Sequence, residues 1–237
     1  MADPQWRRIA GFRVVFTSGT GMSLPPRPPV NWRARMAGFV AVLLIIGGAA
    51  AIGVATLTQQ HAPQPGQNAA GDTAAAGRGP RLTRSEPVAV SIPAIGVQSS
   101  LLHLGLNADG TIQVPSLYKQ PQEAAWYKYS VTPGQIGSSV IEGHVDTLNG
   151  PAVFYRLGAL RPGNTIDVTL ADGVTAVFRI TGVRAYAKDN FPTKTIYGSS
   201  DYAALHLITC GGAFDFSTGH YLSSTVVFAS LVTSHGA

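Results

Sequence analysis

Residues 88–232 consist of short apolar runs separated by turn signals, and this pattern restricts the fold more than any other feature of the chain. Residues 165–170 alternate, Ala171-Asp172-Gly173 form a turn signal, and residues 174–180 pair back as a predicted hairpin. Helical periodicity is scarce, with short turns of helix expected near 155–160 and 199–205. About seven or eight such strands predict a mostly β fold, a closed or nearly closed β-barrel. The remaining strand signals lie at 88–93, 111–115, 138–142, 181–187, 205–210 and 224–232.

An uncharged apolar segment at 37–57 precedes this region. As a helix it is about 31 Å long, enough to cross the hydrocarbon core of a bilayer. Arg33 and Arg35 lie directly before it, so we expect residues 1–36 to form a basic cytoplasmic tail and the C-terminal part to lie outside the membrane. A signal peptide or a buried core helix is the alternative. The apolar region of a signal peptide is usually shorter, about 7–15 residues, which favours a retained transmembrane anchor.

Residues 58–87 are rich in Ala, Gly, Pro and Gln and show no apolar periodicity, so we expect a flexible, disordered linker before a folded domain at 88–232. The formal charge of +5 is unevenly distributed along the chain. Residues 1–85 hold nine Arg against Asp3 and Asp72, whereas the rest of the chain holds eight Lys or Arg against ten Asp or Glu. Because basic residues do not cluster in the predicted domain, a nucleic-acid partner is not expected.

Cys210, the single cysteine, ends the apolar run at 204–209 and is followed by two glycines that leave room for a substrate backbone. Residues 139–143 lead to His144 in the same way. A thiol and an imidazole at two strand ends are the minimum for a cysteine nucleophile with a basic partner. The alternative is packing, because free cysteines are mostly buried.

Asp146 lies in the polar loop after His144, and it either orients the imidazole ring or only forms a turn. The other histidines have neither ligand spacing nor cysteine partners, so we expect no metal site. They are His61, His103, His206, His220 and His235. Since the chain also lacks a phosphate-cradling glycine motif before a helix, we expect no cofactor.

Three motifs are more specific together than each is alone. They read IEGHVD at 141–146, LITCGG at 207–212, and GHY at 219–221 followed by VVFA at 226–229. With them the chain resembles the sortases, the cysteine transpeptidases of Gram-positive cell envelopes, and in particular the class E/F type of actinobacteria. The resemblance implies an eight-stranded barrel with a Cys–His–Arg site. Carried over, Cys210 is the nucleophile, His144 is the acid/base, and Thr209, Gly211 and His220 are expected to contact the substrate.

The arginine of the family has no counterpart, because no Arg or Lys follows Cys210. Sortases place it on the strand after the cysteine loop, where this chain reads GHYLSSTV at 219–226. Ser224 lies closest to the expected position and is our candidate catalytic donor. Losing a donor that stabilises a tetrahedral intermediate costs ~10²–10³ in rate. Other candidate replacements are Ser223, His220, Arg156 and Arg184.

The resemblance implies acyl transfer from a secreted protein with a C-terminal LPXTG-like sorting signal. Cys210 would form a thioester, which an amine of a peptidoglycan precursor or of a pilin then resolves. The alternative is a catalytically impaired sortase-fold binding module of the envelope, which the missing arginine favours. An L,D-transpeptidase is disfavoured because the Ser-His-Gly-Cys run is absent, and a papain-like hydrolase would place its cysteine before its histidine.

Overall fold

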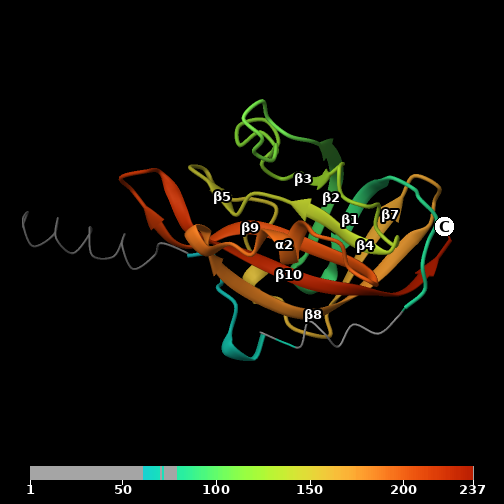
Figure 1. The fold of residues 1–237 in the computed structure, drawn as a ribbon. Coiled ribbons are helices and arrows are strands. Elements are labelled where there is room, and N and C mark those ends of the chain that lie inside the picture. Colours follow the sequence, from blue (N-terminus) through green and yellow to red (C-terminus); the bar gives the residue numbers. More distant parts are fainter. Residues whose placement is uncertain (1–60, 70, 72–78, 237) are drawn as a thin grey trace, which may run out of the picture. The chain divides into compact units, whose positions relative to one another are not determined.

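The computed structural model describes residues 61–69, 71 and 79–236. Eight strands close into a barrel in the order β1-β2-β3-β4-β9-β10-β8-β7 (Figure 1). This arrangement confirms the predicted mostly β, closed eight-stranded fold. The barrel strands are β1 (Pro87–Ile92), β2 (Val97–Leu104), β3 (Ala124–Tyr127), β4 (Gly137–Glu142), β7 (Thr165–Leu170), β8 (Thr175–Ala187), β9 (Ala203–Asp215) and β10 (His220–His235).

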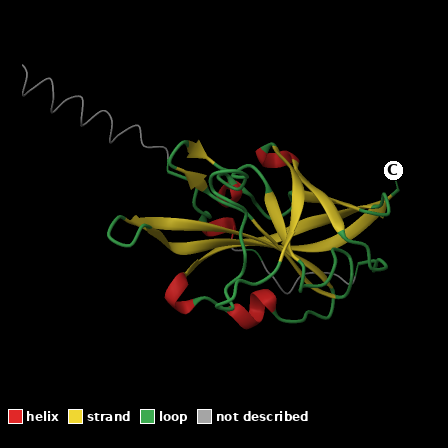
Figure 2. Cartoon of the chain, turned by 90° about the horizontal axis from the view of Figure 1, so that it is seen from above, coloured by secondary structure: helices red, strands yellow, loops and turns green. Residues whose placement is uncertain are grey.

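The remaining elements are short and lie around the barrel (Figure 2). Strands β5 (Asp146–Thr147) and β6 (Gly150–Pro151) form a separate two-stranded sheet. The helices are η1 (Gln67–Ala69), η2 (Pro93–Ile95), η3 (Leu157–Ala159), η4 (Lys188–Asn190) and α2 (Thr193–Tyr197). The connection from β8 to β9 therefore carries two of them, η4 and α2.

Side-chain alternation explains why the strands close around one core. In β7 every second residue is buried, and Ile166, Val168 and Leu170 all point inward. The turn to β8 places Gly173 at φ 85°, a conformation that glycine adopts at little cost. Among the described residues, the largest fully buried side chains are Trp126, Phe154 and Phe178.

Strand β9 is buried on both faces. Leu205 and Leu207 belong to the barrel interior, whereas Ile208 packs with Val226 and with Ile196 of α2 in a second, outer cluster. This double coverage explains the nearly continuous apolar run before Cys210. Because side chains alternate, Cys210 shares the outer face with Ile208, at the edge of the cluster that α2 covers.

The structure differs from the predicted elements in several places. Residues 111–115 form only an isolated bridge between Leu106 and Ile112, within a long loop. Strands β2 and β3 were not predicted, and β3 contains only four residues, too few to show a periodicity. The helical turn expected near 199–205 occurs earlier, as α2.

The predicted tail at 1–36 and the predicted transmembrane segment at 37–57 lie outside the described residues. Within the described ranges, every helix is too short or too polar to cross a bilayer. Part of the predicted linker at 58–87 packs against the barrel: Ala69 is fully buried in the core, and the Leu82 N–H donates to the Gly134 carbonyl at 2.8 Å.

Candidate active site

Cys210 lies within a long hairpin rather than at the end of its strand. Strand β9 continues past it to Asp215 before the chain turns into β10. The pairing of the two strands shifts beyond Gly211, and Gly212 has φ 77°, the left-handed geometry of a β-bulge. The thiol is therefore held on a paired strand, next to a local irregularity, and it is partly exposed.

Ser224 is the direct cross-strand neighbour of Cys210. The antiparallel register pairs these two residues, and on its other side Ser224 pairs with Tyr186 of β8. Paired residues point to the same face with Cβ atoms about 5 Å apart, so the serine lies beside the thiol. Ser224 is nevertheless largely buried, with 9% of its surface exposed.

His144 reaches the same region from the neighbouring strand. Strands β4 and β9 are parallel, with Glu142 beside Ile208, and the Gly143 N–H extends the ladder by donating to the Ile208 carbonyl at 3.1 Å. His144 and Cys210 each lie two residues past the paired Glu142 and Ile208, so continuing the parallel course of two strands about 4.8 Å apart places them near one another. The barrel therefore brings together two residues that are far apart in the sequence.

The imidazole of His144 is oriented by a main-chain carbonyl. Its Nε2 lies 2.6 Å from the Pro115 oxygen, and because a carbonyl can only accept, Nε2 carries the hydrogen. In the neutral ring the lone pair is then on Nδ1. The Phe154 N–H donates to the His144 carbonyl at 2.9 Å and holds the backbone of the residue as well.

Asp146 is bound to β10. The Tyr221 hydroxyl donates to its carboxylate, whereas the contact that orients the His144 ring comes from Pro115. Burial, the hydrogen bond to Asp146 and the charges of Asp146 and Cys210 raise the pKa of Tyr221. This hydrogen bond therefore links the β5–β6 sheet to the hairpin of β9 and β10, which contains Cys210.

Lys188 contributes a cation that the sequence analysis missed. Its Nζ lies 3.6 Å from the Sγ of Cys210. Lys188 follows β8 directly, and β10 separates β8 from β9, so the long side chain extends across β10 to the thiol. The replacements predicted for the arginine are Ser223, Ser224, His220, Arg156 and Arg184, and Lys188 is not among them. The proximity of Lys188 to Cys210 becomes evident only when the order of the strands is known.

The predicted substrate residues have different positions. Thr209 is buried, as expected for a neighbour of Cys210 that points to the opposite face. Gly211 lies close to the Thr225 hydroxyl and to Gln64. His220 is exposed at the start of β10, four positions from Ser224 and therefore about 13 Å along the strand.

Arg156 and Arg184, the two arginines among the candidate replacements, have different surroundings from Lys188. Arg184 donates from Nη2 to the Gly71 carbonyl at 3.1 Å and lines a hollow beneath α2 together with Ser138 and His206. Arg156 is exposed directly before η3. Lys188, by contrast, has a contact with the thiol in the described part of the chain.

The segment before β1 passes close to the cysteine loop. The Gly212 N–H donates to Oε1 of Gln64 at 3.1 Å. A Cβ at Gly158 would lie 2.0 Å from the Pro63 oxygen, so the same segment also runs tightly over η3. Gln64 of the predicted linker therefore contacts the glycine loop two residues after Cys210.

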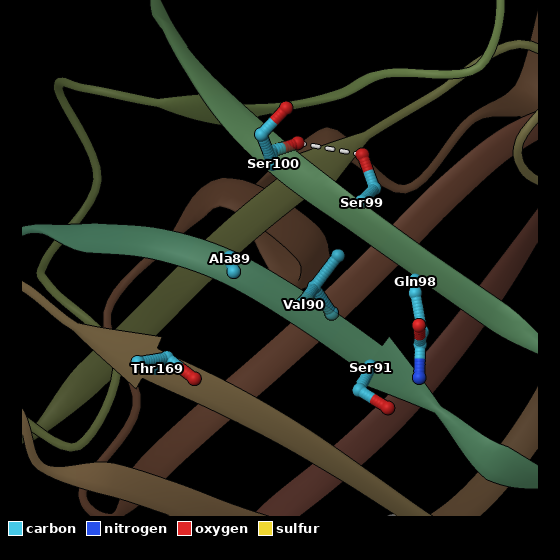
Figure 3. A pocket seen from close by; sticks show the side chains of 7 residues that line it. All are labelled: Ala89, Val90, Ser91, Gln98, Ser99, Ser100 and Thr169. Carbon is cyan, nitrogen blue, oxygen red and sulfur yellow. Dashed lines mark hydrogen bonds between the residues drawn. The ribbon is translucent and has the colours of Figure 1, made fainter.

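A further hollow lies over β1, β2 and β7, and Cys210, His144 and Lys188 are not among the residues that line it (Figure 3). Its labelled side chains are small or uncharged, among them Ser91, Gln98 and Thr169. Uncharged side chains alone supply neither a nucleophile with a base nor a set of metal ligands. Across the ranges that the structure describes, acidic, histidine and cysteine side chains form no group of three that could hold a metal ion.

One family model matches this chain over more than half of its length. Residues 90–232 match the family described as Sortase domain, a range that includes both His144 and Cys210. A search of curated proteins found no match.

Similar solved structures are sortases as well. Sortase A of Listeria monocytogenes has 14% identity and a TM-score of 0.48, covering 64% of this chain and 90% of that one. Sortase C1 of Streptococcus agalactiae has 19% identity and a TM-score of 0.47, with 61% and 66% covered. A lid mutant of sortase A from Corynebacterium diphtheriae has 20% identity and a TM-score of 0.47, with 65% and 73% covered.

Proposed function

This chain belongs to the sortase family, and on that premise we propose that it is a cysteine transpeptidase with Cys210 as nucleophile and His144 as acid/base. The observation that supports the proposal is the parallel pairing of β4 and β9, because His144 and Cys210 each lie two residues past the paired Glu142 and Ile208. The partly exposed thiol leaves a path for a substrate carbonyl. We assign the chain to the class E/F type on its IEGHVD and LITCGG motifs.

The reaction has two acyl-transfer steps. The Cys210 thiolate attacks the carbonyl carbon of a threonyl–glycyl bond in an LPXTG-like signal, the C–N bond breaks, and the leaving amine takes a proton from His144. The product is a thioester on Sγ. An amine of a peptidoglycan precursor or of a pilin then gives a proton to His144, attacks the thioester and releases the thiolate.

The chain context suits a substrate at the membrane surface. We propose that residues 37–57 anchor the protein with residues 1–36 in the cytoplasm, because the apolar segment is long and the arginines lie on one side. Tethering enzyme and substrate to one surface raises their effective concentration. Resistance of the full-length protein to extraction at alkaline pH supports the anchor, and release into the soluble fraction refutes it.

Mass spectrometry of the full-length protein tests the function. Mixed with an LPXTG-type peptide, the wild-type chain is expected to gain the acyl fragment on Cys210 and to transfer it to an added amine. Cys210→Ala removes the nucleophile, so ligation is expected to fall to the uncatalysed level while the circular dichroism spectrum of the barrel is kept.

Two outcomes would contradict the assignment. Ligation by Cys210→Ala would exclude the thiol as nucleophile. A folded wild-type chain that binds such peptides without forming a thioester would instead favour the second candidate, an envelope binding module, which is supported by the missing arginine after Cys210.

A further inference from the structure

A lysine stands next to the reactive sulfur in a chain that has no basic residue after its cysteine except histidine. The Lys188 Nζ lies 3.6 Å from Sγ, which is hydrogen-bonding distance for a sulfur acceptor. The lysine comes from the connection between β8 and β9 and not from β10. It therefore cannot be inferred by aligning positions along the strand after the cysteine.

We propose that Lys188 is a catalytic residue that supplies the positive charge at Cys210, an inference that rests on the proposed function. An ammonium group close to the sulfur stabilises the thiolate, which is the nucleophilic form. It also lies within reach of the oxygen that becomes negatively charged when the sulfur attacks a carbonyl, because that oxygen is bound to the same carbon as the sulfur. The Lys188 ammonium group can thus stabilise the negative charge of the thiolate first and that of the tetrahedral intermediate afterwards.

The neighbouring residues explain why this role falls to Lys188. Ser224, the residue closest to the expected arginine position, pairs with Cys210 but carries no charge and is largely buried. A hydroxyl can donate one hydrogen bond, whereas an ammonium brings three donors and a full charge. Charge-assisted hydrogen bonds are roughly twice as strong as neutral ones.

The single cysteine permits a direct test without any peptide substrate, because iodoacetamide alkylation of the full-length chain reports on Cys210 alone. The reagent is neutral, so the charge of the variant does not steer it. Lys188→Met is expected to slow alkylation at pH 7 by about tenfold or more, since the thiolate and not the thiol reacts. Lys188→Arg keeps the charge and is expected to recover most of the rate.

Lys194→Met is the matched control. Lys194 is also exposed and lies in the same connection, on α2, so its loss changes the net charge equally. Its alkylation rate is expected to equal that of the wild type. The proposal is overturned if Lys188→Met, with an unchanged circular dichroism spectrum, is alkylated within twofold of the wild-type rate, or if Lys194→Met slows alkylation as much.

Peptide turnover distinguishes this proposal from the function on which it rests. In Lys188→Met, turnover of the LPXTG-type peptide is expected to fall ~10²–10³-fold, the loss typical of a missing donor to the tetrahedral intermediate. Should the wild type form no thioester while alkylation still depends on Lys188, the transpeptidase function fails and the pairing of lysine and thiol stands. Turnover in the wild type with no loss in Lys188→Met overturns the catalytic role alone.

Discussion

Glu142, two residues before His144, forms a hydrogen-bonded pair with Tyr197 of α2. The Tyr197 hydroxyl donates to the Glu142 carboxylate at 2.7 Å, which ties α2 to the end of β4. Burial raises the pKa of Glu142, and the hydrogen bond from Tyr197 offsets only part of that rise. The pKa of Tyr197 is also raised, by burial and by the charge of Glu142, so the tyrosine keeps its proton.

The raised pKa of Glu142 gives the folding stability a defined pH dependence. The folded state holds this proton at pH values where the unfolded chain has lost it, so stability falls as pH rises from the unfolded pKa through the folded one. Glu142→Gln removes the titration and is expected to flatten the decline between pH 4 and pH 8. Urea denaturation at a series of pH values measures it.

A companion variant changes the same profile in the opposite direction. Tyr197→Phe removes the hydrogen bond that favours the carboxylate, so stability is expected to fall more steeply toward pH 8 than in the wild type. Equal profiles for the wild type and both variants would show that Glu142 titrates alike in the folded and unfolded chains.

At the scale of elements, β4 delivers its histidine through a tightly packed glycine. A Cβ at Gly143 would lie 2.7 Å from Val153 Cγ1 and from Phe154 Cδ2. Both side chains are buried, and the ring of Phe154 is fully enclosed in the core. The close approach lets the chain leave β4 and turn into the His144 segment.

Gly143→Ala is expected to reduce the free energy of unfolding by about 1–3 kcal/mol, because an added methyl group overpacks this part of the core. Turnover should also fall, since His144 is displaced with the backbone. Urea denaturation gives the first quantity and a peptide ligation assay the second. Gly236→Ala, at a position with open space around it, serves as the control, and a loss of equal size there would contradict the packing explanation.

At the scale of the whole molecule, part of the segment at 58–87, whose composition is typical of a linker, packs against the barrel. Gln64 binds the Gly212 N–H, and Ala69 is fully buried in the core. Such a segment can detach without global unfolding, so its contribution is measured best by local hydrogen exchange. The cysteine loop is thereby connected to the chain that precedes β1.

Ala69→Asp is expected to release the segment, because an unpaired carboxylate is unfavourable in the core. The Gly212 amide should then exchange about tenfold faster, the change that about 1.4 kcal/mol produces. Gln67→Asp adds the same charge at an exposed position and should leave the exchange unchanged. Unchanged exchange in Ala69→Asp would mean that the Gly212 amide is protected independently of this segment.

The sequence by itself determined the mostly β class, the closed barrel and the family. Alternation with period two and glycine or proline turns are local signals, and the single cysteine and the LITCGG motif can be read directly. It also singled out Cys210 and His144, whose chemical roles remain predictions. Local signals failed where pairing decides the structure, as at the four-residue β3 and the bridge at Ile112.

Only the tertiary structure decided which groups surround the thiol. The order β9-β10-β8 brings Lys188 to Cys210, the parallel β4–β9 pairing directs the chain that carries His144 toward the same region, and a linker segment contacts Gly212. The physical reason is that period two specifies which face a side chain occupies, whereas the partner of each strand is chosen by hydrogen bonds between distant segments. A cation that directly follows β8, a strand two places away from β9 in the sheet, therefore leaves no trace in the sequence near the cysteine.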